Sequence, residues 1–341
     1  MRQSVGPIVR VLAAMCLLAC SAGSAVAQDE GDLDLSARQR VFPGVGPGLR
    51  SIKRGADGRL YILASPSPGL LVFDAQGKQV LSVNELGVAS SGTGQGHALI
   101  TFGEDCDGAA DGKIYVADRG ANLIQVFTSD GAPLRAIRMN APVAVAALPE
   151  GEVAVATLRE PHLVIVFDKN GKDVREFGDP EPLSEREDYN RYLSIGQLAT
   201  DAQGHLYYAF SYVPEPTVRQ YDRLGYAGQD FQYTAVEAFA TAQAARKEIE
   251  RQESKGKEPS FKRVLTAVGV DRTNGEVWIA LNNRLLHFDK EGNRRATYKI
   301  YTPQGARLEA NTILVEQDRL IIGSDPLGIY EFERPDKKNT K

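Results

Sequence analysis

Short stretches of alternating apolar and polar residues recur along the chain, and each is bounded by a glycine or aspartate turn. One recurring element is a turn glycine followed by an aliphatic and then an aromatic residue, as in Gly-Arg-Leu-Tyr at 58–61. Alternation with a period of two predicts β-strands rather than helices. The clear copies begin at Gly58, Gly112, Gly204 and Gly275, and weaker copies begin at Gly151 and Asp318.

A second element follows each copy of the first. It is an alternating strand that ends in an aromatic residue, usually followed by aspartate and a glycine turn. The copies lie at 71–77, 125–131, 165–171, 219–225, 286–292 and 329–333, and 13 to 17 residues separate each first anchor from its aromatic residue. We interpret the recurring Asp74, Asp168, Asp222 and Asp289 as turn residues.

The two elements together predict a four-stranded antiparallel meander with tight glycine turns. Such a unit cannot bury both of its faces alone, so six units are expected to stack around a channel. The sequence therefore predicts an all-β fold, a six-bladed β-propeller over residues 38–334. The last unit supplies only three strands, at 310–316, 319–324 and 328–334, and we expect residues 38–42 to complete it and close the ring.

One stretch also resembles a known repeat. Ile-Tyr-Val-Ala-Asp-Arg-Gly-Ala-Asn-Leu-Ile-Gln-Val-Phe at 114–127 resembles an NHL repeat, and Phe-Pro-Gly-Val-Gly-Pro-Gly at 42–48 resembles the opening of exported bacterial six-bladed propellers. The resemblance covers residues 38–334 and implies the propeller fold. It implies no single activity, because such families include scaffolds, ligand-binding proteins, lactonases and lyases.

Two long connections interrupt the repeat, and both are expected at the same channel entrance. Residues 178–194 are predicted to form a charged loop between blades three and four. Residues 233–262 separate blades four and five, and 234–254 are predicted to be helical because they lack Gly and Pro. The expected apolar stripe is Val236, Phe239, Ala242, Ala245 and Ile249. This helix is interpreted as a surface helix, a lid over the channel or a partner-docking element.

The N-terminal residues have the pattern of an export signal. Arg2 and Arg10 precede an apolar run at 11–19, and small residues then lead to an Ala-x-Ala site at 25–27, which predicts a signal peptide over 1–27 cleaved after Ala27. A periplasmic or secreted protein is expected, with a flexible segment at 28–37 and a charged tail at 335–341. The apolar run is too short to span a membrane, so no integral membrane segment is predicted. Residues 17–20 also resemble a lipobox, and the alternative is a lipid anchor at Cys20.

Charge and cysteine content narrow the function further. The 341-residue chain has a formal net charge of -4, which argues against a nucleic-acid partner. Signal cleavage leaves Cys106 as the only cysteine, and we expect a small residue in a turn rather than a reactive thiol.

Polar residues at the predicted start of each inner strand are the candidate channel site. They are Arg50, His97, Asn140, Arg191, Arg263 and Asn311. Three converging arginines would favour a small anionic ligand, although polar residues are also ordinary on exposed strand ends. The preferred interpretation is a non-enzymatic platform that binds a protein or a small anionic ligand, with no cofactor and no metal site predicted.

The alternative is an enzyme, a metal-dependent hydrolase of lactonase type or a lyase, with a divalent cation such as calcium at the channel. Asn140 and Asn311 would contribute oxygen ligands, but no acidic residue is predicted at the start of an inner strand. The four histidines, His97, His162, His205 and His287, are not predicted to converge on zinc. Residues 105–112 are similar to a calcium loop, but their Asp and Gly residues favour an enlarged hairpin turn.

Overall fold

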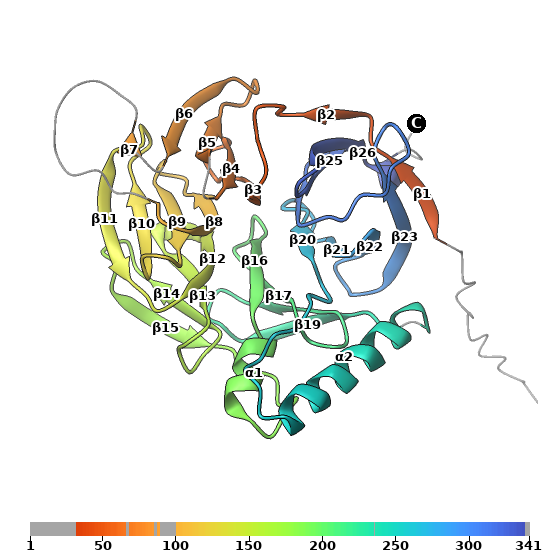
Figure 1. The fold of residues 1–341 in the computed structure, drawn as a ribbon. Helices are drawn as coiled ribbons and strands as arrows, with labels where there is room; N and C mark the ends of the chain where they lie inside the picture. Colours follow the sequence, from red (N-terminus) through yellow and green to blue (C-terminus); the bar gives the residue numbers. More distant parts are fainter. Residues whose placement is uncertain (1–31, 66–67, 85–86, 89–99, 235, 338–341) are drawn as a thin grey trace, which may run out of the picture. The chain divides into compact units, whose positions relative to one another are not determined.

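Consecutive hairpins along the chain form six separate sheets that are arranged as the blades of a ring (Figure 1). The computed structural model describes residues 32–65, 68–84, 87–88, 100–234 and 236–337. These lie in one compact unit, Asp32–Lys341. The predicted signal peptide, its cleavage after Ala27, Cys20 and His97 all lie outside the described residues.

The first three blades follow the predicted order of inner to outer strand. Blade one contains β3 (Leu49–Arg54), β4 (Leu60–Ala64), β5 (Gly69–Phe73), β6 (Gln79–Asn84) and the short β7 (Gly87–Val88). Blade two contains β8 (Gly103–Gly108), β9 (Ile114–Asp118), β10 (Leu123–Phe127) and β11 (Pro133–Arg138). Blade three contains β12 (Pro142–Ala147), β13 (Val153–Thr157), β14 (Val164–Phe167) and β15 (Asp173–Phe177), with the short helix η1 (Pro149–Gly151) in its first hairpin.

The last three blades have the same layout. Blade four contains β16 (Gly196–Thr200), β17 (Leu206–Phe210), β18 (Thr217–Tyr221) and β19 (Ala227–Gln232). Blade five contains β20 (Ala267–Val270), β21 (Val277–Leu281), β22 (Arg284–Phe288) and β23 (Arg294–Tyr301), with β1 (Leu33–Ser36) added outside. Blade six contains β24 (Thr312–Val315), β25 (Arg319–Ser324), β26 (Gly328–Glu333) and β2 (Gln39–Val41).

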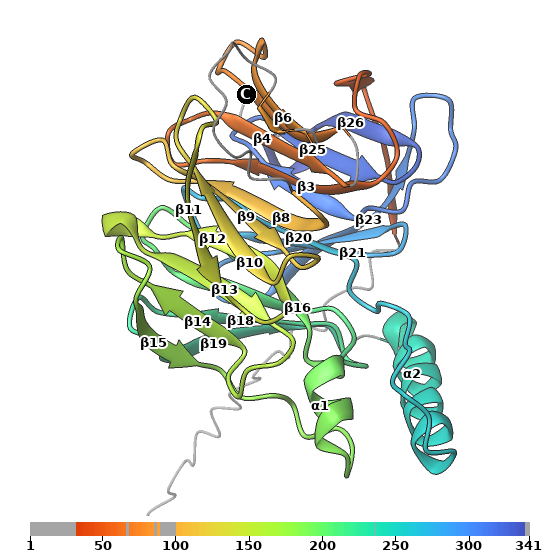
Figure 2. The same ribbon diagram turned by 60° about the vertical axis from the view of Figure 1, so that its left-hand side comes forward.

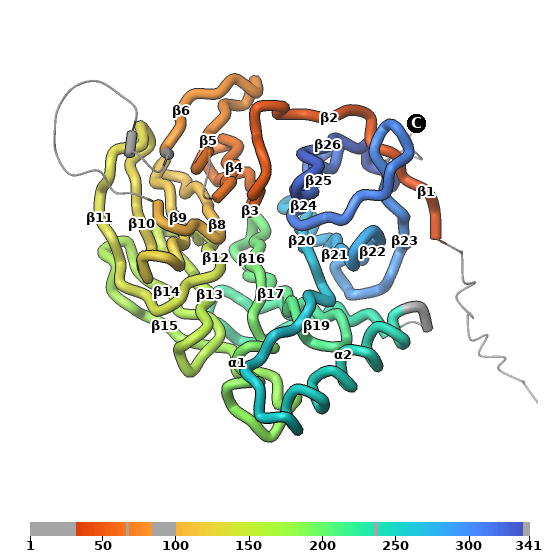
Figure 3. Tube along the Cα trace, viewed as in Figure 1, coloured from red at the N-terminus to blue at the C-terminus, as the bar shows by residue number. Residues whose placement is uncertain are grey.

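The inner strands close the ring. Each one contacts the inner strand of the next blade, from β3 to β8 and onward to β24, which contacts β3 again (Figures 2 and 3). Strand β2 pairs antiparallel with β26, with Gln39 opposite Glu331 and Val41 opposite Ile329. The six-bladed propeller and the closure of its sixth blade by an N-terminal strand are therefore confirmed.

The core is divided among the blade junctions. Six apolar clusters form, and each contains residues from two neighbouring blades. In one of them Tyr115 of blade two packs with Val145 and Val155 of blade three. This is the arrangement expected when each blade covers the apolar face of its neighbour. The turn role of the recurring aspartates is confirmed as well, because the Asp168 carboxylate accepts hydrogen bonds from the amides of Asn170 and Lys172.

The N-terminal segment differs from the expectation. The segment expected to be flexible, 28–37, contains β1, which pairs in parallel with β23 and was not predicted. The Asp32 carboxylate lies 3.0 Å from Arg284 Nε and 3.3 Å from Lys299 Nζ, which holds this strand on blade five. The predicted charged tail, 335–341, begins with the short helix η2 (Pro335–Lys337).

Both inserts contain helices. Helix α2 (Val236–Ser254) confirms the helix predicted in the second insert, and α1 (Glu187–Leu193) lies in the segment that was predicted to be a loop. Ala238, Ala242 and Ile249 of α2 are buried, whereas Phe239 is 61% exposed, so its place in the predicted stripe is wrong. Within the described residues, no helix is long and apolar enough to cross a membrane.

The two inserts pack against each other. Tyr189 and Leu193 of α1 form an apolar cluster with Ile249 of α2, and Tyr212 and Phe261 pack against it. The Tyr189 hydroxyl donates a hydrogen bond to the Lys257 carbonyl oxygen at 2.8 Å, which joins the two connections.

Candidate functional site

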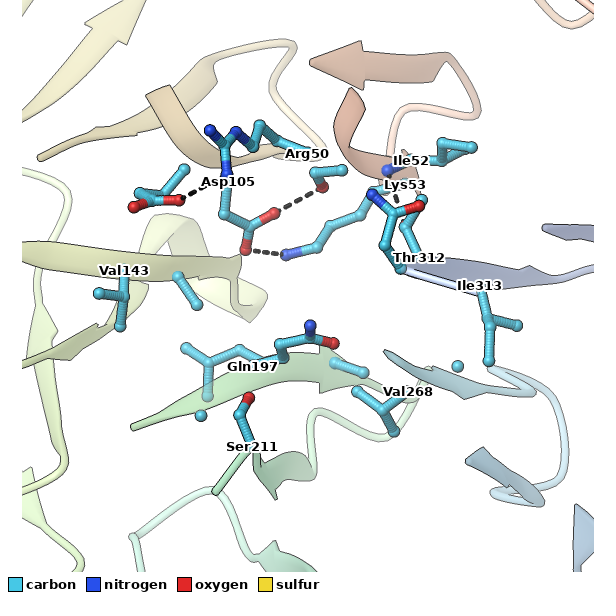
Figure 4. Close-up of a pocket in the computed structure, with 18 of the residues that line it drawn as sticks. Arg50, Ile52, Lys53, Asp105, Val143, Gln197, Ser211, Val268, Thr312 and Ile313 are labelled. Atoms are coloured by element: carbon cyan, nitrogen blue, oxygen red, sulfur yellow. Dashed lines mark hydrogen bonds and ion pairs between the residues drawn. The ribbon is translucent and has the colours of Figure 1, made fainter. Parts of the chain in front are cut away.

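A central cavity of about 210 Å³ is lined by the inner strands of all six blades (Figure 4). Sites for drug-sized ligands usually enclose roughly 300–1,000 Å³. The cavity is therefore suited to a small molecule rather than to an extended one.

Backbone bulges bring three side chains to this cavity. In β3, β8 and β12 the pairing with the second strand skips one residue, and the skipped residues are Arg50, Glu104 and Val143. All three line the cavity. A bulge redirects the extra residue of a strand and is common beside functional sites. A β-bulge therefore positions a cation, an acid and an apolar residue in three successive blades.

Two arginines from blades one and two share one aromatic support. The guanidinium carbons of Arg50 and Arg119 lie 4.8 and 5.2 Å from the centre of the Phe102 ring. Arg119 Nε lies 2.9 Å from a Glu104 carboxylate oxygen, and Arg50 Nη1 lies 3.8 Å from the other. Arg50 Nε is buried without a hydrogen-bond partner among the described residues. One acid thus partly balances two cations, and one donor stays unsatisfied.

A third arginine enters from the connection that follows α2. Arg263 lines the cavity and is exposed, and its guanidinium makes no hydrogen bond or ion pair within the described part of the chain. Burial and the neighbouring Tyr212 raise the pKa of Tyr192, and the positive charge of Arg263 opposes this rise. Arg263 therefore lies close to the tyrosines of the cavity mouth with its donors free.

A partly buried lysine crosses the interior of the cavity. Lys53 Nζ donates to Asp105 Oδ2 at 2.6 Å and to the Val145 carbonyl oxygen at 2.6 Å, so it spans from blade one to blade three. The Ser51 hydroxyl donates to the other Asp105 oxygen at 2.6 Å. Burial alone would lower the pKa of Lys53, but Asp105 and Asp107 outweigh it and raise that pKa. Lys53 is consequently a charged structural cation and not a neutral nucleophile.

The carboxylates of this region are already satisfied. Asp105 accepts from Lys53, Ser51 and the amides of Cys106 and Val145. Asp107 accepts from the amides of Gly108 and Ala147, and burial raises its pKa. Calcium prefers six to eight oxygen ligands, and here each carboxylate is bound to donors of the protein instead. The cavity acids do not fit a divalent cation.

This finding corrects three predictions. Residues 105–108 belong to inner strand β8, so they do not form the expected turn, and Glu104 and Asp105 place acids in the channel where none was predicted. Cys106 is fully buried in the same strand rather than in a turn, and burial raises its pKa well above the usual range, which leaves the thiol unreactive.

The structure brings together only part of the predicted site. Arg50, Arg263 and Asn311 line the cavity. The Asn140 amide donates to Glu160 at 3.0 Å, and Arg191 on α1 bonds to Glu187, and neither residue lines the cavity. The inner strands of blades three and four begin at Pro142 and Gly196, after Asn140 and Arg191, so these two residues do not lie at a strand start as predicted. The cavity residues that sequence reasoning missed are Lys53, Glu104, Arg119, Tyr192 and Tyr212.

No histidine of the described residues lines the cavity. One group elsewhere, Glu276, His287 and Asp336, has ligand atoms within 4.8 Å of one another. The Arg334 guanidinium lies 3.0 Å from a Glu276 oxygen and 2.6 Å from an Asp336 oxygen, so a cation already occupies the centre of this group. We interpret it as a structural ion-pair network.

The charge of the cavity differs in sign from that of the chain. Six basic side chains line it, against three acidic ones, which leaves a formal excess of three positive charges. The basic residues are Arg50, Lys53, Arg54, Arg119, Arg263 and Arg272, and the acidic ones are Glu104, Asp105 and Asp107. The whole chain carries -4. The lining is therefore basic although the chain is acidic, and one of its cations, Arg54, is paired with Glu316 outside the lining.

No protein-family model matches the chain, and no curated protein matches its sequence. Solved structures do share its architecture. A streptogramin B lyase is 12% identical over 85% of this chain and 84% of its own, with a TM-score of 0.54. A gluconolactonase from Xanthomonas campestris is 15% identical over 85% of this chain and 87% of its own, also with a TM-score of 0.54. The WD40 repeats of RRP9 are 9% identical over 88% and 99% of the two chains, with a TM-score of 0.56. At these identities the likeness concerns the fold alone, and it shows a protein of the propeller class without indicating its activity.

Proposed function

We propose that this protein is an exported propeller, built of NHL-like repeats, that binds a small organic anion in its central cavity. The periplasm or the cell exterior is the proposed location, after cleavage behind Ala27. The observation that carries the ligand proposal is the excess of positive charge in a small cavity, with the unpaired guanidinium of Arg263 at its mouth. Guanidinium groups recognise carboxylates and phosphates through paired N–H donors.

Asn311 supports the same site from blade six. Its side-chain amide donates to the Leu49 carbonyl oxygen at 2.7 Å, which fixes the orientation of the amide. Its oxygen Oδ1 is then left buried without a hydrogen-bond partner among the described residues. Unsatisfied buried polar atoms are uncommon in native proteins. Because Oδ1 only accepts hydrogen bonds, it favours a ligand that also carries a donor, whereas the unsatisfied donor Arg50 Nε favours the anionic group itself.

An enzymatic role is the second proposal, because two of the similar structures are a lyase and a gluconolactonase. A metal-dependent enzyme is less well supported than a metal-independent one, since the cavity carboxylates are bound to donors of the protein. Binding therefore remains the function that the geometry supports best.

Calorimetric titration of the mature protein with acetate and with inorganic phosphate at low ionic strength tests the proposal. We expect millimolar or tighter binding of at least one anion, weakened about tenfold in Arg263→Gln because one charge-assisted contact is lost. Arg138→Gln is the matched control, since Arg138 is exposed on outer strand β11 and does not line the cavity. Absence of binding by the wild type, or equal weakening by both variants, would contradict the proposal.

A further inference from the structure

The mouth of the cavity has two unlike halves. Blades one and two contribute Arg50 and Arg119 together with Glu104, the acid that lies beside both of them. Blades three and four, with the first insert, contribute apolar and aromatic side chains that also line the cavity. These are Val143, Leu158, Tyr192, Ile195 and Tyr212. A bare inorganic anion would make no contact with the apolar and aromatic side chains of the second half.

We infer that the bound anion is a carboxylate attached to a planar apolar ring, with the ring against the apolar and aromatic side chains and the carboxylate bound by the free guanidinium of Arg263. This inference rests on the proposed function and specifies its ligand class.

The apolar half is exposed enough to receive a ligand. Leu158 and Ile195 are only partly buried and belong to none of the apolar core clusters of the described residues. Val143 is the bulged residue of β12, and Figure 4 shows it among the side chains around the cavity, with Val268 and Ile313. Contiguous apolar surface in a concave site favours an apolar ligand group.

The aromatic part of the mouth is held rigidly by the inserts. The Tyr192 and Tyr212 rings lie 5.1 Å apart and are tilted by 47°. Phe261 lies 5.8 Å from the Tyr192 ring and 5.7 Å from the Tyr189 ring, edge-on to both. Such offset and edge-on contacts are the preferred geometries of aromatic rings. The two inserts therefore hold the aromatic wall of the site, and Arg263 directly follows the second insert.

The cavity volume agrees with a ring of this size. A protein cavity of about 150 Å³ holds benzene, and the cavity here is about 210 Å³. The difference leaves room for a carboxylate beside the ring.

Calorimetric titration of the full mature protein with benzoate and with acetate tests the inference. Both probes carry one carboxylate, and only benzoate carries a ring. We expect benzoate to bind about tenfold more tightly or better, with a more negative heat-capacity change, because ring burial removes apolar surface from water. Arg263→Gln should weaken both probes by a similar factor, since both place a carboxylate at Arg263.

A variant pair locates the apolar half. Leu158→Ser should weaken benzoate binding several-fold and leave acetate binding unchanged. Leu224→Ser is the matched control, since Leu224 is 66% exposed and does not line the cavity, and it should change neither. If circular dichroism shows that Leu158→Ser is misfolded, the wild-type comparison and its heat-capacity change decide alone.

The outcomes separate the two proposals. Benzoate binding no tighter than acetate binding, with both dependent on Arg263, would overturn the aromatic ligand and leave the anion site intact. If neither benzoate, acetate nor phosphate binds, the proposed function falls and this inference falls with it. Tight benzoate binding that is insensitive to Leu158→Ser would place the ring elsewhere and also overturn the inference.

Discussion

Arg334 shows how one residue joins the end of the chain to the ring. Its side chain is fully buried, and its guanidinium lies 2.5 Å from an Asp271 oxygen and 2.6 Å from an Asp336 oxygen. It also lies 3.0 Å from Glu276, whose other neighbour is the buried His287. Burial opposes ionisation of both aspartates, but the hydrogen bonds from Arg334 outweigh it and lower the pKa of each. A buried cation is tolerated here because carboxylates surround it.

We predict that this network makes the protein sensitive to acid. The two aspartates have lower pKa values in the fold than the usual unfolded value of about 3.9, so the unfolded chain takes up protons first as the pH falls. The stabilisation is complete above that value and is lost as the pH falls through the lowered values. Urea unfolding between pH 7 and pH 3 should show a smaller acid loss in Arg334→Gln, with about 3–5 kcal/mol less stability at pH 7. Arg38→Gln, which removes an exposed ion-pair partner, is the control. If Arg334→Gln loses as much unfolding free energy between pH 7 and pH 3 as the wild type, the assignment is refuted.

At the scale of elements, the ring depends on a three-residue strand. Strand β2 supplies the outer edge of blade six. Val41 and Phe42 pack against the core between blades six and one, and the Phe42 ring lies 4.8 Å from the Phe73 ring. Without β2 the backbone of β26 would present an open edge, which favours pairing between molecules.

Truncation tests this role of β2. A protein that starts at residue 43 should lose about 3–5 kcal/mol of unfolding free energy, from the lost packing of Val41 and Phe42, and should associate in size-exclusion chromatography. A protein that starts at residue 37 retains β2 and loses only β1, so we expect a smaller loss and no association. Equal behaviour of the two proteins would show that β2 is not needed for closure.

At the scale of the whole molecule, charge is unevenly distributed. The chain is acidic overall, and the channel is basic. The basic lining therefore favours an anion in the channel, where low surrounding dielectric strengthens the interaction. The acids of the channel serve to hold Lys53 and Arg119, and they are not free ligands.

Because the channel acids are bound to donors of the protein, we predict that metal removal does not change the stability of the fold. Thermal unfolding of the mature protein at neutral pH should give the same melting temperature, within about 1 °C, with EDTA and with added calcium, because bound ligands stabilise only through affinity for the folded state. Elemental analysis after mild purification provides the independent check. A stoichiometric metal whose removal lowers the melting temperature would instead support the metal-dependent enzyme.

The sequence by itself determined the blades. Turn glycines, alternation and the aromatic–aspartate turns are local signals, because a hairpin and its register depend on residues close together in the chain. The lack of helix breakers at 234–254 is also a local signal, and it predicted α2. The turn and strand signals also predicted that residues near 38–42 complete blade six, since an incomplete blade leaves an unpaired edge.

Only the tertiary structure decided the site. Asp105 and Asp107 resemble turn residues in the sequence, and they occupy a buried strand because Lys53 and the amides of blade three satisfy them. Arg119 and Tyr192 come from different connections and meet at one cavity only when the ring closes. Burial of charge depends on partners that are distant in sequence. Local pattern therefore specifies the blades, and the chemistry of the channel arises from contacts between blades.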